Sequence, residues 1–319
     1  MHLRPLLLAL LTITTAARAE MTEEQKRVPL EADTHDPKLA KIVLLAGSVS
    51  NKPGQHEYFA GCALMMDWLK QNGAVWPVMA ANGWPQDEHI FDGARAVVVY
   101  ADGGAKLPFL DPARMELMRK LMAGGAGFVM LHQSVDIPDA QAPEVQAWLG
   151  GAFTADIGCR GHWDMSFDQF PSHPTMRGVQ PFAAPLDGWL YNLHFAEQGV
   201  VPLLTGAVPD KSRTTADAQS HTGRAETIGW AYERPDGGRS FAFTGCDLHR
   251  NWQVESQRRL VTNGILWTAK LEVPEAGAKV EFNPADLAKN LDDKPKPAPK
   301  AAQKPAPVTT AAPAPEATK

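Results

Sequence analysis

The sequence predicts a doubly wound α/β domain built on a mostly parallel sheet flanked by helices. In the first half of the chain, short apolar runs typical of strands buried on both faces alternate with stretches of helical period. Short turns connect these segments, as in strand–helix–strand units. The second half has shorter alternating runs, which indicate irregular β insertions before a closing helix.

Four apolar runs in the first half are expected to form parallel strands. They are residues 41–47, 74–79, 94–100 and 127–131. Two stretches between them, residues 59–73 and 111–125, repeat apolar residues at helical spacing. The second of these opens with an Asp-Pro pair that suits the start of a helix.

The second half is expected to be less regular. Residues 162–167 and 191–195 predict short strands, and residues 227–245 predict a hairpin around a Pro-Asp-Gly-Gly turn. Residues 254–271 predict a closing amphipathic helix.

Residues 1–19 have the pattern of a secretory signal peptide. Arg4 gives a basic start, residues 6–11 form an apolar core, and residues 17–19 fit a small-x-small cleavage site. The apolar core is too short for a membrane span, and no later segment has the composition of one. We therefore expect an exported protein, periplasmic or secreted.

The remaining boundaries follow changes in composition. We expect an N-terminal extension at residues 20–40, one folded domain at 41–273, a linker at 274–293 and a disordered tail at 294–319. The tail alternates Lys, Pro and Ala, so it buries too little apolar surface to offset its ordering entropy.

Charge and cysteine content narrow the class of partner. Loss of Arg4 and Arg18 with the signal peptide changes the formal charge from −5 to −7, whereas a nucleic-acid partner favours a basic face. Cys62, Cys159 and Cys246 form no metal-type pair such as C-x-x-C. The sequence allows one disulfide among the three and does not say which two would form it. The expected partner is a small molecule, and the oligomeric state is not indicated.

Polar side chains follow several of the expected strands at the point where each strand ends. Ligands of open α/β sheets bind outside the carboxyl ends of the strands, so these loops are expected to meet at one edge. The residues concerned are His56, Glu57, Asp102, His132, Gln133, Asp247 and His249.

These residue types support two kinds of chemistry. His56, His132 and His249 come from different strand ends and are candidates for a zinc site with an open position. Alternatively, His132 with Glu57, Asp102 and Asp247 as carboxylate partners suits acid/base catalysis. No G-x-S-x-G elbow or phosphate-binding glycine loop is present.

Aromatic and amide side chains near the same loops suggest a sugar ligand, because aromatic faces stack on sugar rings. The alternative is that these large side chains pack the core. The candidate substrate-binding residues are Tyr58, Gln133, Trp189, Tyr191, Asn251 and Trp252.

An ordered set of segments resembles the trehalose-utilisation, or ThuA-like, family. It includes GGAGFVMLHQS at residues 124–134, DGWLYNLHF at 187–195 and ETIGWAYERPDGGRSFAFTGCDLHRNW at 226–252. The resemblance implies a flavodoxin-like sheet of the class I glutamine amidotransferase type and a link to sugars, including keto sugars. It also implies a histidine-bearing cleft able to hold zinc, for which His56, His132 and His249 are the matching positions.

Two positions depart from the family pattern. The position of the amidotransferase nucleophile reads Leu131-His132-Gln133-Ser134, without cysteine, so glutaminase activity is not expected. Many relatives have Asp-Glu where this chain has Asp187-Gly188. The leading hypothesis is an exported hydrolase, lyase or isomerase acting on a glycoside or modified sugar. The alternative is a non-catalytic carbohydrate-binding module.

Overall fold

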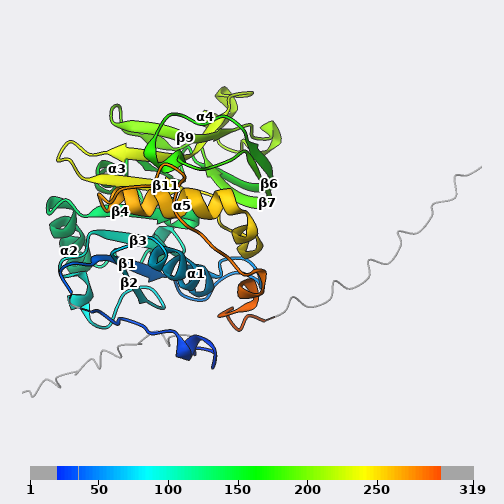
Figure 1. Ribbon diagram of the computed structural model, residues 1–319. Coiled ribbons are helices and arrows are strands. Elements are labelled where there is room, and N and C mark those ends of the chain that lie inside the picture. Colours follow the sequence, from blue (N-terminus) through cyan, green and yellow to red (C-terminus); the bar gives the residue numbers. More distant parts are fainter. Residues whose placement is uncertain (1–19, 35, 296–319) are drawn as a thin grey trace, which may run out of the picture.

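A computed structural model describes residues 20–34 and 36–295 (Figure 1). The expected signal peptide and all but the first two residues of the expected tail lie outside these ranges. The central sheet has seven strands in the order β2-β1-β3-β4-β11-β10-β9. They are β1 (Ala40–Ala46), β2 (Val75–Ala80), β3 (Ala96–Tyr100), β4 (Gly127–Leu131), β9 (Val200–Gly206), β10 (Glu226–Glu233) and β11 (Arg239–Phe243).

Strand direction confirms the predicted fold class. β2, β1, β3, β4 and β11 are mutually parallel, and β10 and β9 extend the sheet in antiparallel fashion. The expected hairpin at residues 227–245 is the β10–β11 pair. β4 lies between β3 and β11, so the loop after it emerges near the middle of the sheet.

Two pairs of helices cover the two faces of the sheet. α1 (Tyr58–Lys70) and α5 (Glu255–Thr268) pack on one face and lie in front of it in Figure 1. α2 (Pro112–Ala123) and α3 (Ala142–Leu149) pack on the other. Alternate residues of each strand supply the two cores, because successive side chains of a strand point to opposite faces.

The second half adds two small sheets. β6 (Cys159–Phe167) pairs with β7 (Phe182–Tyr191), and β5 (Gly151–Ala152) pairs with β8 (His194–Phe195). The short helices are α4 (Ala216–Ser220), η1 (Gln25–Arg27), η2 (Glu88–Phe91), η3 (Gly104–Lys106), η4 (His132–Val135), η5 (Pro174–Met176), η6 (Asp210–Ser212), η7 (His249–Gln253) and η8 (Pro284–Ala288).

Both segments that flank residues 41–273 contact the domain. In the expected linker, Ala278 and Val280 are buried, and Lys294 at the start of the expected tail is only 6% exposed. Cys62, Cys159 and Cys246 are buried free thiols. Among the described residues, no helix has the length and apolarity needed to cross a membrane.

Candidate metal centre

Side chains from four strand-end loops meet at the carboxyl edge of the sheet. His56 comes from the loop after β1, Asp102 from that after β3, His132 directly follows β4, and Asp247 follows β11. All but Asp102 are at most 4% exposed. The four loops converge as expected for a doubly wound sheet, where the carboxyl ends of parallel strands share one edge.

The backbone at this edge is strained. His56, His132 and Cys246 have φ values of 49°, 55° and 75°, in the left-handed region that side chains other than glycine avoid. Such residues cost roughly 1–3 kcal/mol each and cluster at functional sites. The strain falls on the two histidines and on the residue before Asp247, which are the positions that bring this cluster together.

Three atoms form a tight triangle at the centre of the cluster. The Nε2 atoms of His56 and His132 are 3.1 Å apart. Asp247 Oδ1 is 3.3 Å from His56 Nε2 and 3.6 Å from His132 Nε2. The Oδ1 atom is buried and has no hydrogen-bond partner among the described residues.

Outer contacts fix which nitrogen of each histidine carries the proton. His132 Nδ1 lies 3.0 Å from the Thr244 carbonyl oxygen, which can only accept, so Nδ1 donates. His56 Nδ1 lies 2.9 Å from Asp102 Oδ1 and donates for the same reason. Burial lowers the pKa of His132 to about 4, which keeps its ring neutral near pH 7. In a neutral imidazole whose Nδ1 carries the proton, Nε2 is the acceptor nitrogen and is free to bind a cation.

Asp102 is the outer partner of His56. Its Oδ1 accepts hydrogen bonds from Ser50 Oγ at 2.9 Å and Tyr58 OH at 2.7 Å, in addition to the His56 ring. Burial acts to raise the pKa of this carboxyl, but the hydrogen bonds from His56, Tyr58, Lys106 and Ser50 outweigh it and hold the pKa well below its usual range. Asp102 is therefore ionised and orients the His56 ring.

The second oxygen of Asp247 is held by two side chains. Asp247 Oδ2 accepts from Gln55 Nε2 at 2.8 Å and lies 2.6 Å from His162 Nε2. His162 is on β6, directly opposite Gly188 of β7. Its ring is 54% exposed, so it links the buried cluster to the surface.

Asp187 holds the loop that carries Asp247. Its carboxylate accepts from the backbone N–H groups of Cys246 and Leu248, each at 3.0 Å. Burial raises the pKa of Asp187 to about 6, although these hydrogen bonds oppose the shift. A Cβ at Gly188 would lie 2.7 Å from Asp247 Oδ2. Asp247 thus occupies the space that a side chain at position 188 would enter.

The triangle fits a divalent cation. Tetrahedral zinc with bonds of about 2.0–2.2 Å to nitrogen and oxygen places its ligand atoms about 3.4 Å apart, close to the three separations here. Asp247 Oδ1 is buried without a hydrogen-bond partner among the described residues, and a cation among the three atoms would satisfy it. His56, His132 and Asp247 therefore form a candidate metal site with partners that fix the imidazole orientation.

His249, expected as the third ligand, does not join this group, and Asp247 takes its place. His249 begins η7 and is buried near Glu57, Lys294 and the Leu287 backbone, where burial lowers its pKa to about 4. Glu57 is also outside the cluster, since its Oε1 accepts from the Gly54 N–H and its Oε2 from the Asp292 N–H.

A hollow of about 770 Å³ adjoins the cluster. Three of its lining residues contact the triangle: Gln55 and His162 through Asp247, and Asn51, whose Nδ2 is 3.4 Å from His56 Nε2. Its lining also includes an aliphatic wall of four leucines, Leu186, Leu248, Leu287 and Leu291. This hollow therefore borders the cluster through Asn51, Gln55 and His162.

The expected sugar-stacking residues do not line this hollow. Tyr58, Trp189, Tyr191 and Trp252 are at most 1% exposed, so they offer no free ring face. They pack in one core cluster. Asn251 is fully buried, with its Nδ2 3.3 Å from the Pro185 carbonyl oxygen. Gln133 is half-buried in η4 and does not line the hollow.

Sequence reasoning missed two residues that line the hollow and contact the cluster, His162 and Asn51.

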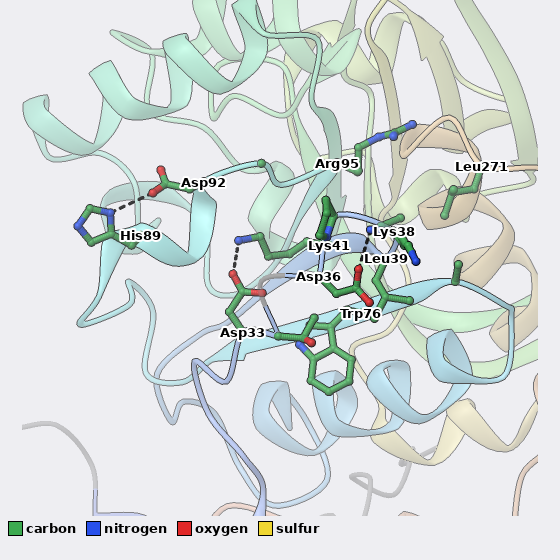
Figure 2. Close-up of a pocket in the computed structure, with 15 residues that line it drawn as sticks. Asp33, Asp36, Lys38, Leu39, Lys41, Trp76, His89, Asp92, Arg95 and Leu271 are labelled. Atoms are coloured by element: carbon green, nitrogen blue, oxygen red, sulfur yellow. Dashed lines mark hydrogen bonds and ion pairs between the residues drawn. The ribbon is translucent and has the colours of Figure 1, made fainter.

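A second hollow, of about 700 Å³, lies at the opposite edge of the sheet, where β1 and β2 begin (Figure 2). Two pairs of its charged side chains contact each other: Lys41 Nζ with Asp33, and His89 Nδ1 with Asp92 Oδ2 at 3.0 Å. Arg95, which also lines it, donates to the Ala269 carbonyl oxygen. It contains none of the cluster residues, so it is not the candidate site.

Comparison with known proteins agrees with this fold. The model of the trehalose-utilisation family, ThuA, matches residues 48–268. A ThuA-like protein from Parabacteroides merdae superposes with a TM-score of 0.54 at 13% identity, covering 78% of this chain and 99% of that one. One from Bacteroides uniformis gives 0.51 at 12% identity, covering 74% and 94%. No protein with a curated description matches in sequence. The chain belongs to the ThuA family.

Proposed function

We propose that this chain is a metal-dependent enzyme of carbohydrate metabolism, and that its first 19 residues direct its export. The observation that supports a metal ion is the buried triangle of His56 Nε2, His132 Nε2 and Asp247 Oδ1. The family's description as trehalose utilisation supports a sugar substrate. Two imidazoles and one carboxylate form a ligand set that catalytic zinc takes, and zinc is the ion of this proposal.

The residues around the triangle have distinct roles in this proposal. A cation bound there would polarise a substrate oxygen as a Lewis acid. The Thr244 carbonyl and Asp102 hold the two ring protons away from the centre. Asn51 and Gln55 line the hollow beside the triangle with amide groups that suit sugar hydroxyls.

His162 is the proposed proton-transfer group. Its ring lines the hollow, is 54% exposed and contacts Asp247 Oδ2. Hydrolysis, elimination and isomerisation of a sugar each need a proton moved at a substrate oxygen or carbon, and an imidazole can both accept and donate a proton. The proposal therefore covers a hydrolase, lyase or isomerase, and excludes a glutaminase because no cysteine follows β4.

Metal analysis and product analysis together test the proposal. We expect purified protein to contain, or to bind in titration, one zinc ion per chain, and to convert a disaccharide or keto-disaccharide in a substrate panel. The His162→Ala variant should keep zinc and lose turnover. Sugar binding without product, with every divalent metal supplied, would instead indicate a non-catalytic carbohydrate-binding module. Absence of any metal binding would contradict the metal role.

A further inference from the structure

The C-terminal segment after α5 packs against the domain although it lies beyond the family-matched residues 48–268. In Figure 1 this orange segment passes from the end of α5 to the side of α1. Amide side chains at the end of α1 pair with its backbone: Asn72 with Lys279 and Gln71 with Glu281. The N-terminal extension holds it from outside, since Gln25 Nε2 donates to Asp292 Oδ1 at 2.9 Å.

This segment places a buried ammonium group under the loop of His56. The Lys294 side chain is fully buried, and its Nζ donates to the backbone carbonyl oxygens of Gln55 at 2.5 Å and His56 at 3.0 Å. Glu57 Oε1 is 3.2 Å from the same nitrogen, and Asp292 Oδ2 is 3.5 Å away. A buried charge is costly unless it is paired and hydrogen-bonded, and here both conditions are met.

The contacts of Lys294 act where the backbone is strained. The two carbonyl groups that it binds flank the His56 Cα, whose φ is 49°. Glu57 adds to the restraint by accepting from the Gly54 and Asp292 N–H groups. From the inner side, the His56 N–H donates to the Asp247 carbonyl oxygen at 3.1 Å. Residues 54–57 are thus held between the Asp247 loop and the C-terminal segment.

We propose that Lys294 is a positioning residue: its buried ammonium holds the His56 loop in the strained conformation that aims His56 Nε2 at His132 and Asp247. The same segment supplies Leu287 and Leu291 to the aliphatic wall of the hollow. The zinc readout of this proposal rests on the proposed metal site. Functional groups must be held within about 0.5 Å of their productive geometry, which explains why a distant segment is recruited.

The test compares zinc affinity and amide exchange in Lys294→Met with two controls on the same segment. Val280→Ala removes buried contacts without touching the loop, and Lys289→Met removes an exposed pair with Asp286. We expect Lys294→Met to weaken zinc binding about 10- to 100-fold, as for other residues that orient metal ligands, with both controls within about twofold of the parent. We also expect faster exchange of the Gly54 and His56 amides in Lys294→Met alone.

The two readouts separate failure of this inference from failure of the metal proposal. If the parent protein binds no zinc, the metal proposal fails, and amide exchange without metal still decides the role of Lys294. A folded Lys294→Met protein with parental exchange at Gly54 and His56, and parental zinc affinity where zinc binds, overturns the inference. If Lys294→Met does not fold, Lys294→Ala, which also removes the donors to the two carbonyl oxygens, takes its place with the same criteria.

Discussion

The two hollows of this protein have similar volumes but different chemistry. The one at the carboxyl edge, about 770 Å³, adjoins a cluster in which the buried Asp247 Oδ1 has no hydrogen-bond partner among the described residues. In the one at the amino edge, about 700 Å³, Lys41 pairs with Asp33 and His89 pairs with Asp92. Volume therefore does not identify the site. The site is marked instead by the coincidence of two costly features: a buried carboxylate oxygen of Asp247 without a hydrogen-bond partner among the described residues, and left-handed backbone at His56 and His132.

The largest expected effect separates the two edges directly. His132→Ala removes one corner of the triangle, and we expect zinc affinity to fall by more than the roughly 100-fold limit typical of outer partners. The matched control is His89→Ala at the amino edge, where the ring is exposed and paired with Asp92. Titration calorimetry with zinc measures both. Equal zinc affinity in the two variants would remove His132 from the site.

Acid should destabilise the protein through the carboxyl edge. His132 and His249 have folded pKa values of about 4, below the unfolded value of about 6.5, because burial disfavours the charged ring. Each neutral ring contributes up to roughly 3 kcal/mol to the free energy of unfolding. This contribution is fully present above pH 6.5 and is lost as the pH falls through 4. Asp187 acts oppositely, since its raised pKa of about 6 favours the folded state at low pH and offsets part of this loss.

Urea unfolding between pH 7 and pH 4.5 measures this effect. We expect the free energy of unfolding of His249→Leu to fall less steeply between pH 7 and pH 4.5 than that of the parent. The variant lacks one of the two rings that are neutral when folded and take up a proton on unfolding. His89→Ala is the control from the amino edge, where the exposed ring pairs with Asp92 and its pKa is raised by that hydrogen bond. An unchanged acid limb in His249→Leu would contradict the buried, neutral state of this ring.

The sequence predicts the fold better than it predicts the site. Apolar runs ending in polar residues locate β1, β3 and β4, and the ligand-edge rule then brings His56, Asp102, His132 and Asp247 together. Asp247 and His249 are two residues apart, and the turn into η7 decides which of the two side chains faces the cluster. Strand ends alone do not fix that turn.

Three other features escape sequence reasoning for physical reasons. His162 lies within a β6 strand whose pairing with Gly188 is non-local, so nothing nearby in the sequence marks it. Trp189 and Tyr191 have the composition of a sugar site, but their burial depends on packing between distant segments. Lys294 opens a Lys- and Pro-rich stretch typical of disorder, and only the acids around it explain its burial.

A smaller effect is expected from the outer partner of His56. Asp102→Asn keeps the shape of the side chain but places an amide donor within reach of His56 Nδ1, which favours the other tautomer and turns the lone pair away from the triangle. We expect a 10- to 100-fold loss of zinc affinity. Nitrogen-15 NMR of the metal-free protein should show the tautomer change in one histidine. Parental zinc affinity with a parental spectrum would exclude the orienting role.

The smallest effect is expected at the amino edge, which serves as the negative control for the hollow at the carboxyl edge. Asp92→Asn removes the carboxylate that pairs with His89, but both side chains are more than three-quarters exposed. Exposed pairs contribute little, so we expect the free energy of unfolding to change by less than about 0.5 kcal/mol and zinc affinity to stay parental. A loss of turnover in Asp92→Asn would show that the amino-edge hollow has a function of its own. If stability, zinc affinity and turnover all stay at parental values, the His89–Asp92 pair in Figure 2 belongs to a hollow without a role in catalysis or metal binding.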